Sequence, residues 1–315
     1  MKKRNVGIHH ITSIVGNPQK NAEFYGEVLG LRMVKKSVNF DDPRVYHLYF
    51  GDKDARPGTI ITFFPYEDAG EGIVGDGQVG VTTYIIPEGA MSFWEDRLGK
   101  FNIDYKISER FNEKYLEFND PHGLKLELVE RKDGVKNHWG LDDIDSSVAI
   151  KGFGGAVFYS HFPEVTAKTV EEMLGLERIG REGDFLRFKS SGDIGNIIDV
   201  KMVSSGRGKN NIGTVHHISW RAEDEEDLLE WQELARENKF VVTDIKERNY
   251  FKSIYFRERG GILFEIATDG PGFTFDEDID SLGEKFVLPE WHEDKRERLE
   301  KTLPPINIRR GQESK

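Results

Sequence analysis

Alternating apolar and polar residues, which are typical of strands, are interrupted along this chain by segments with helical periodicity. The first segment predicts one strand, one helix and three further strands, at residues 6–15, 17–30, 32–38, 45–50 and 59–64. Asn17 is a suitable helix N-cap, Pro18 fits the first helical turn, and Gly30 fits the left-handed position at which a helix ends. The opening pattern is therefore strand, helix, then several strands.

The same order recurs, which indicates four copies of one unit. The later copies are predicted at residues 79–130, 153–203 and 214–268. Helix ends with Leu-Gly recur at Leu98-Gly99 and Leu174-Gly175, and Asn238 replaces glycine as the left-handed cap in the fourth copy. A polar segment at 131–150 is predicted to link two halves. The predicted organisation is a domain at 1–135, a domain at 150–270 and a C-terminal tail at 271–315.

Two histidine pairs occupy equivalent places in the first and fourth copies, His9-His10 and His216-His217. Near the end of the fourth copy, Glu265 alternates with the apolar residues of its strand, so it should point to the concave side of a sheet. His10 and His217 join Glu265 there if their strands have the matching orientation. Periodicity leaves this open, because Ile8 and Ile14 lie on the same predicted face as His10.

Two imidazoles and one carboxylate suit Fe(II) or Mn(II) and leave coordination positions open for other ligands. Thr62 aligns with Glu265 but is not a credible fourth ligand. The second and third copies carry Glu127 and Asp199 at this position and lack histidine in their opening strands, so they are predicted to be scaffold. Hydrogen-bonded core histidines are the alternative interpretation. The other histidines are assigned to surface or loop roles, namely His47, His122, His138, His161 and His292.

Composition narrows the class of protein. A hydrophobic content of 37% in 315 residues is sufficient for a core, and a formal net charge of -12 disfavours nucleic acid or an anionic membrane as the main partner. The absence of cysteine excludes disulfides and thiolate ligands and fits a reducing compartment. The basic opening at residues 1–4 has no apolar segment after it, and no apolar run could span a membrane. A cytoplasmic location is therefore expected.

These residues resemble the vicinal oxygen chelate superfamily, whose unit is βαβββ, and within it the hydroquinone ring-cleaving dioxygenases. The resemblance is carried by the stretches 9–43, 46–52, 57–65, 248–258 and 260–268. It implies an α+β fold of four βαβββ modules in two tandem glyoxalase-like domains. It also implies Fe(II) bound by His10, His217 and Glu265, with Arg248 and Tyr255 in the active site. His216 and Thr12 are candidates for supporting roles beside the ligands.

The expected activity is ring cleavage of a hydroquinone, with a catechol as an alternative, using O2 as the second substrate. One competing interpretation is a glyoxalase-type lyase or isomerase that uses Zn(II) or Ni(II), which usually needs a fourth protein ligand. The other is a ligand-sequestering resistance protein that needs no metal. Ring substituents, regiochemistry, self-association and a role in detoxification or in catabolism are left open by the sequence.

Overall fold

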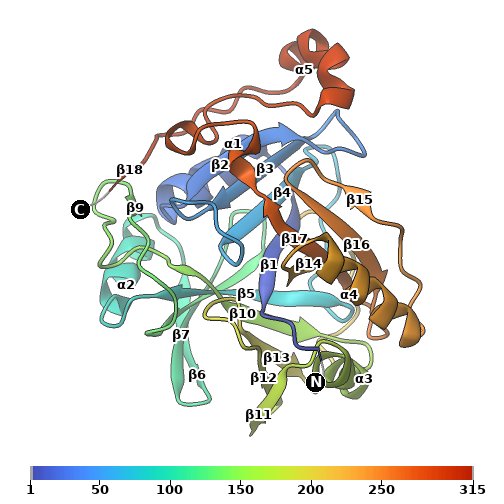
Figure 1. The fold of residues 1–315 in the computed structure, drawn as a ribbon. Coiled ribbons are helices and arrows are strands. Elements are labelled where there is room, and N and C mark those ends of the chain that lie inside the picture. Colours follow the sequence, from blue (N-terminus) through green and yellow to red (C-terminus); the bar gives the residue numbers. More distant parts are fainter. Residues whose placement is uncertain (1–2, 314–315) are drawn as a thin grey trace.

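Two curled sheets of eight strands each form the body of the molecule (Figure 1). The structure is a computed structural model that describes residues 3–313, so half of the basic opening lies outside the described residues. The first sheet has the order β15-β16-β17-β14-β1-β4-β3-β2, and the second has the order β11-β12-β13-β10-β5-β8-β7-β6. The predicted α+β fold of four βαβββ modules is confirmed.

The strands of the four modules match the predicted segments closely. Module one contains β1 (Ile8–Val15), β2 (Arg32–Val38), β3 (Tyr46–Gly51) and β4 (Ile60–Pro65). Module two contains β5 (Gln78–Ile86), β6 (Tyr105–Arg110), β7 (Glu113–Asn119) and β8 (Lys125–Glu130). Module three contains β10 (Gly152–Tyr159), β11 (Glu177–Glu182), β12 (Phe185–Lys189) and β13 (Ile197–Lys201). Module four contains β14 (Thr214–Ala222), β15 (Lys246–Glu247), β16 (Phe251–Arg257) and β17 (Leu263–Pro271).

Each module contributes one helical segment to the outer side of its sheet. These segments are α1 (Pro18–Ala22) with η1 (Glu23–Val28), α2 (Met91–Lys100), α3 (Pro163–Lys168) with η2 (Thr169–Met173), and α4 (Glu225–Glu237). Asn17 caps α1 as predicted, because its side chain accepts a hydrogen bond from the Lys20 N–H. Two predicted helix ends are wrong. Gly99 lies inside α2, and Asn238 has a φ of -77°, so Lys239, with a φ of 64°, is the left-handed residue after α4.

The sheets combine modules from opposite halves of the chain. In the first sheet β1 of module one pairs with β14 of module four, and in the second β5 of module two pairs with β10 of module three. The apolar face of β17, formed by Phe264 and Ile266, is buried in the core. Its alternate residue Glu265 therefore faces the concave side. The domain limits at 1–135 and 150–270 stay a prediction, because each sheet draws strands from both ranges.

The tail follows the outer edge of the first sheet. It contains the short helices η3 (Phe273–Phe275), η4 (Ile279–Ser281), η5 (Glu290–Lys295) and α5 (Arg296–Thr302), and β18 (Gln312–Glu313), which pairs with β9 (Trp139–Gly140). Phe286 bridges to Lys36, and the Val287 N–H donates to the Lys36 carbonyl, so the tail covers the free edge of β2. No helix within residues 3–313 has the length and apolarity needed to cross a membrane.

Candidate metal centre

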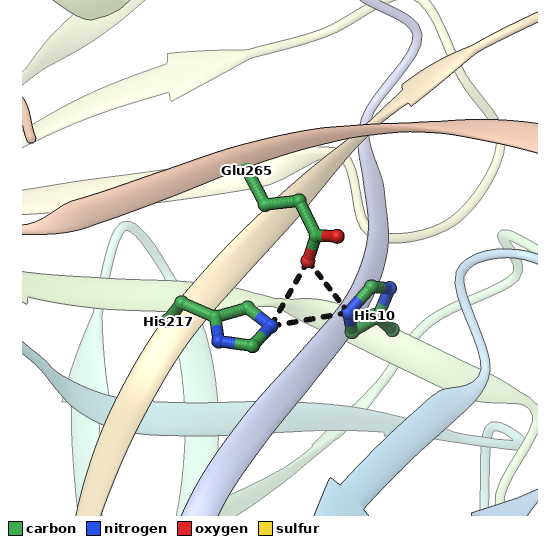
Figure 2. A group of neighbouring side chains, drawn as sticks. All are labelled: His10, His217 and Glu265. Atoms are coloured by element: carbon green, nitrogen blue, oxygen red, sulfur yellow. Dashed lines mark hydrogen bonds and ion pairs between the residues drawn. The ribbon is translucent and has the colours of Figure 1, made fainter. Parts of the chain in front are cut away.

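His10, His217 and Glu265 converge from β1, β14 and β17 on one point of the concave face (Figure 2). One carboxylate oxygen of Glu265, Oε2, lies 2.9 Å from Nε2 of His10 and 2.9 Å from Nε2 of His217. The two Nε2 atoms lie 3.3 Å apart. All three side chains are buried, and within residues 3–313 no other group of His, Cys, Asp or Glu side chains converges in this way.

Two β-bulges explain how strand residues reach this arrangement. The pairing of β1 with β14 shifts by one residue at His9 and again at His216. Ile8 therefore turns into the core with Ile11, while His10 faces the concave side. The sequence pattern left this orientation open because strict alternation does not hold across a bulge. Ile14 does share the face of His10, and it lines the cavity there.

The three side chains meet the chemical requirements of a divalent metal site. Neither oxygen of Glu265 accepts a hydrogen bond of suitable geometry, although the side chain is fully buried. Burial opposes ionisation of Glu265, but the imidazoles of His10 and His217, when they carry positive charge, hold its pKa well below the usual range. Burial lowers the pKa of His217, which favours the neutral ring that metals bind. A buried carboxylate that lacks hydrogen bonds calls for a cation.

The preceding histidines support both imidazoles in the same way. Nδ1 of His9 lies 2.9 Å from Nδ1 of His10, and Nδ1 of His216 lies 2.8 Å from Nδ1 of His217. Because Nε2 of each inner ring faces the shared point, we assign its proton to Nδ1, which donates to the outer ring. Burial lowers the pKa of His9, and it lowers the pKa of His216 to about 3, so both outer rings are neutral acceptors.

A cavity of about 310 Å³ opens beside the three side chains. It is lined by His10, Thr12, Ile14, Asn39, Phe40, Asp41, His47, Tyr49, Phe64, Tyr66, His216, His217, Arg248, Phe251 and Tyr255. Nε of Arg248 donates to the Tyr255 hydroxyl at 3.2 Å. Burial raises the pKa of Tyr255, and the nearby Glu265 adds to this effect, so the phenol keeps its proton. Six of the seven predicted site residues thus line one cavity, and the seventh, Glu265, contacts two of them, His10 and His217, while the roles of all seven stay predictions.

Several histidine assignments need correction. His47 is not a surface or loop residue, because it is buried in β3 and lines the cavity. His292 is buried as well, and its Nε2 lies 3.1 Å from the carbonyl of Phe40. His138 and His161 are exposed, as predicted. His9 was missed as a supporting residue, although the duplicated dipeptide was a signal for it.

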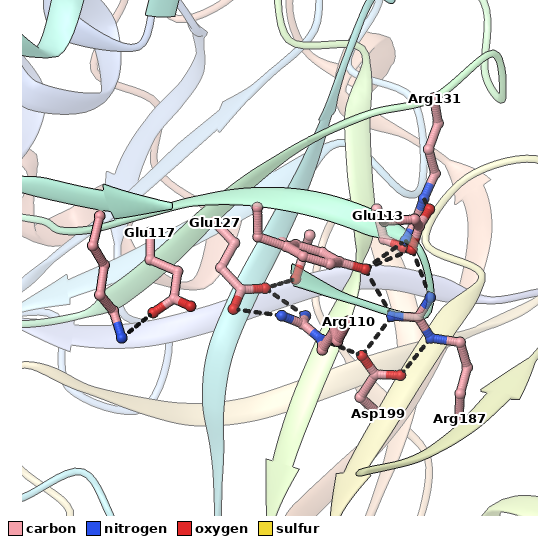
Figure 3. A network of polar contacts seen from close by, with 11 residues as sticks. Arg110, Glu113, Glu117, Glu127, Arg131, Arg187 and Asp199 are labelled. Atoms are coloured by element: carbon pink, nitrogen blue, oxygen red, sulfur yellow. Dashed lines mark hydrogen bonds and ion pairs between the residues drawn. The ribbon is translucent and has the colours of Figure 1, made fainter. Parts of the chain in front are cut away.

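The second sheet shows which side chains stand at the equivalent place in the other two modules. Glu127 and Asp199 occupy the predicted positions on β8 and β13, but Arg110 lies between them (Figure 3). Its guanidinium donates to Glu127 at 2.6 and 3.0 Å and to Asp199 at 2.7 Å. The pairing of β5 with β10 has bulges at Gly80 and Gly154, the counterparts of His9 and His216.

A cavity of about 570 Å³ lies on the second sheet, but the ion pairs of Arg110 explain why it is not the expected reaction site. The carboxylates there are already paired with Arg110, and none of the described residues that line this cavity is a histidine. The absence of a metal site in the second and third modules stays a prediction, which the arginine between their two carboxylates supports.

Comparison with known proteins places the fold in a family. The model of the Glyoxalase/Bleomycin resistance protein/Dioxygenase superfamily matches residues 7–128 and 86–266. The chain therefore belongs to this superfamily. A solved structure of maize glyoxalase I has a TM-score of 0.61 and 11% identity, covers 84% of this chain and 92% of its own, and supports the fold alone.

Full-length relatives define the branch. MhqO of Bacillus subtilis, provisionally named a ring-cleaving dioxygenase, is 57% identical over 309 residues, which cover 98% of this chain and 99% of MhqO. The chlorohydroquinone/hydroquinone 1,2-dioxygenase of Sphingobium indicum is 33% identical, and the match covers 98% of this chain and 99% of that enzyme. A crystal structure of a Bacillus subtilis protein provisionally named a dioxygenase has a TM-score of 0.97 at 56% identity, and the match covers 98% of this chain and 99% of that protein. These relatives place the chain among the oxygenases of the superfamily.

Proposed function

We propose that this protein is an Fe(II)-dependent dioxygenase that opens the ring of a hydroquinone, with Mn(II) as the alternative metal. His10, His217 and Glu265 are the proposed ligands. One observation carries the proposal: three buried ligand atoms, including a carboxylate oxygen without hydrogen bonds, meet at the wall of a small cavity. Two imidazoles and one carboxylate leave open positions on a ferrous ion. When bound, the metal would supply a binding position for the substrate oxygen and for O2.

The protein residues bind, orient and protonate. Arg248 presents a guanidinium to the cavity, which favours the ionised form of a phenol. Tyr255 keeps its phenolic proton because it is buried, so its hydroxyl can donate to an oxygen of the bound ligand. His216 lines the cavity and orients His217. Phe64 and Phe251 add apolar walls that exclude water from the reacting ring.

A hydroquinone or substituted hydroquinone is the proposed substrate, and a catechol is the alternative. The cavity of about 310 Å³ lies at the small end of the range for ligand pockets, which fits a single aromatic ring. The name of the Sphingobium indicum relative specifies chlorohydroquinone and hydroquinone. An aromatic substrate with O2 as the second reactant follows from this proposal. A cytoplasmic location and self-association stay predictions.

The test is O2 uptake after anaerobic loading of the purified chain with Fe(II), with methylhydroquinone as the first substrate. We expect one O2 per ring opened, loss of activity in Glu265→Gln, and little change in Glu117→Gln, which alters a carboxylate of the second sheet. Failure to consume O2 with every hydroquinone and catechol tried would remove the assignment. Metal analysis with Fe(II), Mn(II) and Zn(II) in parallel would identify the functional ion.

The two competing functions have less support. A glyoxalase-type site usually needs a fourth protein ligand, and the hydroxyl of Thr62, at that position, lies 2.7 Å from Thr12 and 2.9 Å from His47. A sequestering protein without metal leaves the buried Glu265 carboxylate without a cation. Conversion of a hemithioacetal would support the former, and tight binding by metal-free protein without turnover would support the latter.

A further inference from the structure

A hydrogen-bonded chain of four side chains crosses the wall of the cavity. Thr12, Thr62, His47 and Tyr49 lie on three adjacent strands, β1, β4 and β3. Oγ1 of Thr12 lies 2.7 Å from Oγ1 of Thr62, which lies 2.9 Å from Nε2 of His47. The Tyr49 hydroxyl lies 2.6 Å from Nδ1 of His47. All four side chains are buried.

The direction of donation along this chain follows from its far end. Within residues 3–313 the Tyr49 hydroxyl has one hydrogen-bond partner, Nδ1 of His47. If His47 donated to Tyr49, the buried phenolic proton would have no acceptor, which is the costlier arrangement. Tyr49 therefore donates to Nδ1. Burial lowers the pKa of His47 and raises that of Tyr49, so the imidazole is neutral and the phenol is protonated.

The remaining donors then have only one consistent arrangement. A neutral imidazole that accepts at Nδ1 carries its proton on Nε2, so His47 donates to the Thr62 hydroxyl. Thr62 has a single hydroxyl proton and donates it to Thr12. The Thr12 hydroxyl proton then has no acceptor among these four side chains, although Thr12 is fully buried and lines the cavity beside His10 and His217.

We propose that Tyr49, His47 and Thr62 are positioning residues that hold the Thr12 hydroxyl as a hydrogen-bond donor toward the cavity. Its acceptor is an oxygen atom of a ligand bound beside His10 and His217, because a buried donor needs a partner and residues 3–313 supply none. This acceptor is the oxygen of an ionised phenol or an oxygen of O2. The direction of hydrogen-bond donation from Tyr49 to Thr12 is independent of the proposed function, whereas the identity of the ligand oxygen that accepts from Thr12 rests on the proposed function.

The tautomer of His47 tests the direction without any turnover. The full chain, labelled with nitrogen-15 in histidine and free of metal, is observed by long-range proton–nitrogen correlation. His47→Gln identifies the His47 signals by their loss. We expect Nε2 of His47 to carry the proton and Nδ1 to have the shift of a nitrogen without one. The reverse tautomer, or a charged ring at neutral pH, would overturn the proposal even if the enzyme proves active.

Kinetics identify the acceptor. Thr12→Val and Thr62→Val remove one hydroxyl each and keep the side-chain shape, and unfolding midpoints check that both variants fold. We expect each to raise one KM about 10-fold, and the double variant no more than either, because both act through one donor. A rise in the KM for hydroquinone identifies the substrate oxygen as the acceptor of the Thr12 hydrogen bond, and a rise in the KM for O2 identifies dioxygen as that acceptor. Additive effects or unchanged KM values would refute the shared role. Inactive wild-type protein with the expected tautomer would refute the proposed function alone.

Discussion

The two outer histidines should contribute unequally to metal affinity, although they occupy equivalent positions. His9 is almost fully buried, whereas His216 is partly exposed and lines the cavity. His9 also has a hydrogen bond with the backbone of Thr268. Replacing each by leucine removes the acceptor for the Nδ1–H of the adjacent ligand. Only at His216 can water from the cavity take over that acceptor role.

The magnitude follows from the cost of a buried donor. A buried N–H without an acceptor costs about 1–3 kcal/mol, which corresponds to roughly 5- to 150-fold in the metal dissociation constant. We expect His9→Leu to weaken binding by about 100-fold, near the upper end of the 10- to 100-fold typical of such outer partners. With water as a substitute acceptor, His216→Leu should weaken binding by about 10-fold or less.

Anaerobic titration with Co(II), followed by its visible absorption, measures both dissociation constants, and competition with a coloured chelator measures Fe(II). Unfolding midpoints of the metal-free variants show whether a change in affinity reflects loss of folding. Equal weakening in the two variants, or a larger loss in His216→Leu, would show that burial does not determine the contribution of these rings. The assignment of His10 as a ligand survives that result, but its support by His9 does not.

Three further predictions concern charged groups. Arg110→Met should lower the free energy of unfolding by about 3–5 kcal/mol in denaturant titrations, because it leaves the buried Glu127 carboxylate without a cation while Asp199 keeps Arg187, and a second change, Glu127→Gln, should recover part of the loss. Burial opposes ionisation of Glu113, but neighbouring arginines lower its pKa to about 2. The stabilisation by ionised Glu113 is therefore present at neutral pH and is lost as the pH falls from the usual pKa of a glutamate toward 2. Glu113→Gln should make the free energy of unfolding depend less on pH in this range. Asp41 is 79% exposed, and its carboxylate lies 3.2 Å from the Arg248 guanidinium. Asp41→Asn should therefore hardly change the unfolding midpoint but should lower the KM for an ionised phenol about two- to fivefold. An unchanged KM would show that the ion pair of Asp41 with Arg248 does not compete with substrate.

Much of the site could be predicted from sequence because repeats make distant residues comparable. Thr62, Glu127, Asp199 and Glu265 align across the four modules, and the structure places them at corresponding positions on β4, β8, β13 and β17. The alignment predicted a contrast between one set of potential ligands and one scaffold, and this contrast stays a prediction. It did not reveal the cation that the scaffold uses, because Arg110 comes from β6 and reaches the carboxylates only in the folded sheet.

His47 shows why the rest was not predictable. It has no counterpart histidine in the other modules, and its strand is buried on both faces, so no alternation distinguishes the cavity side. Only its contacts with Thr62 and Tyr49 reveal a role.

Local periodicity and capping residues determined the order of elements and the four modules, because these depend on neighbours in the chain. The duplicated histidine pairs and the alternation around Glu265 also marked the residues capable of binding a metal. The tertiary structure decided which of them meet. Module one lies beside module four, and bulges at His9 and His216 turn the inner imidazoles toward Glu265. Register and bulges depend on pairing between strands far apart in sequence, and a shift of one residue would send these side chains to the other face of the sheet.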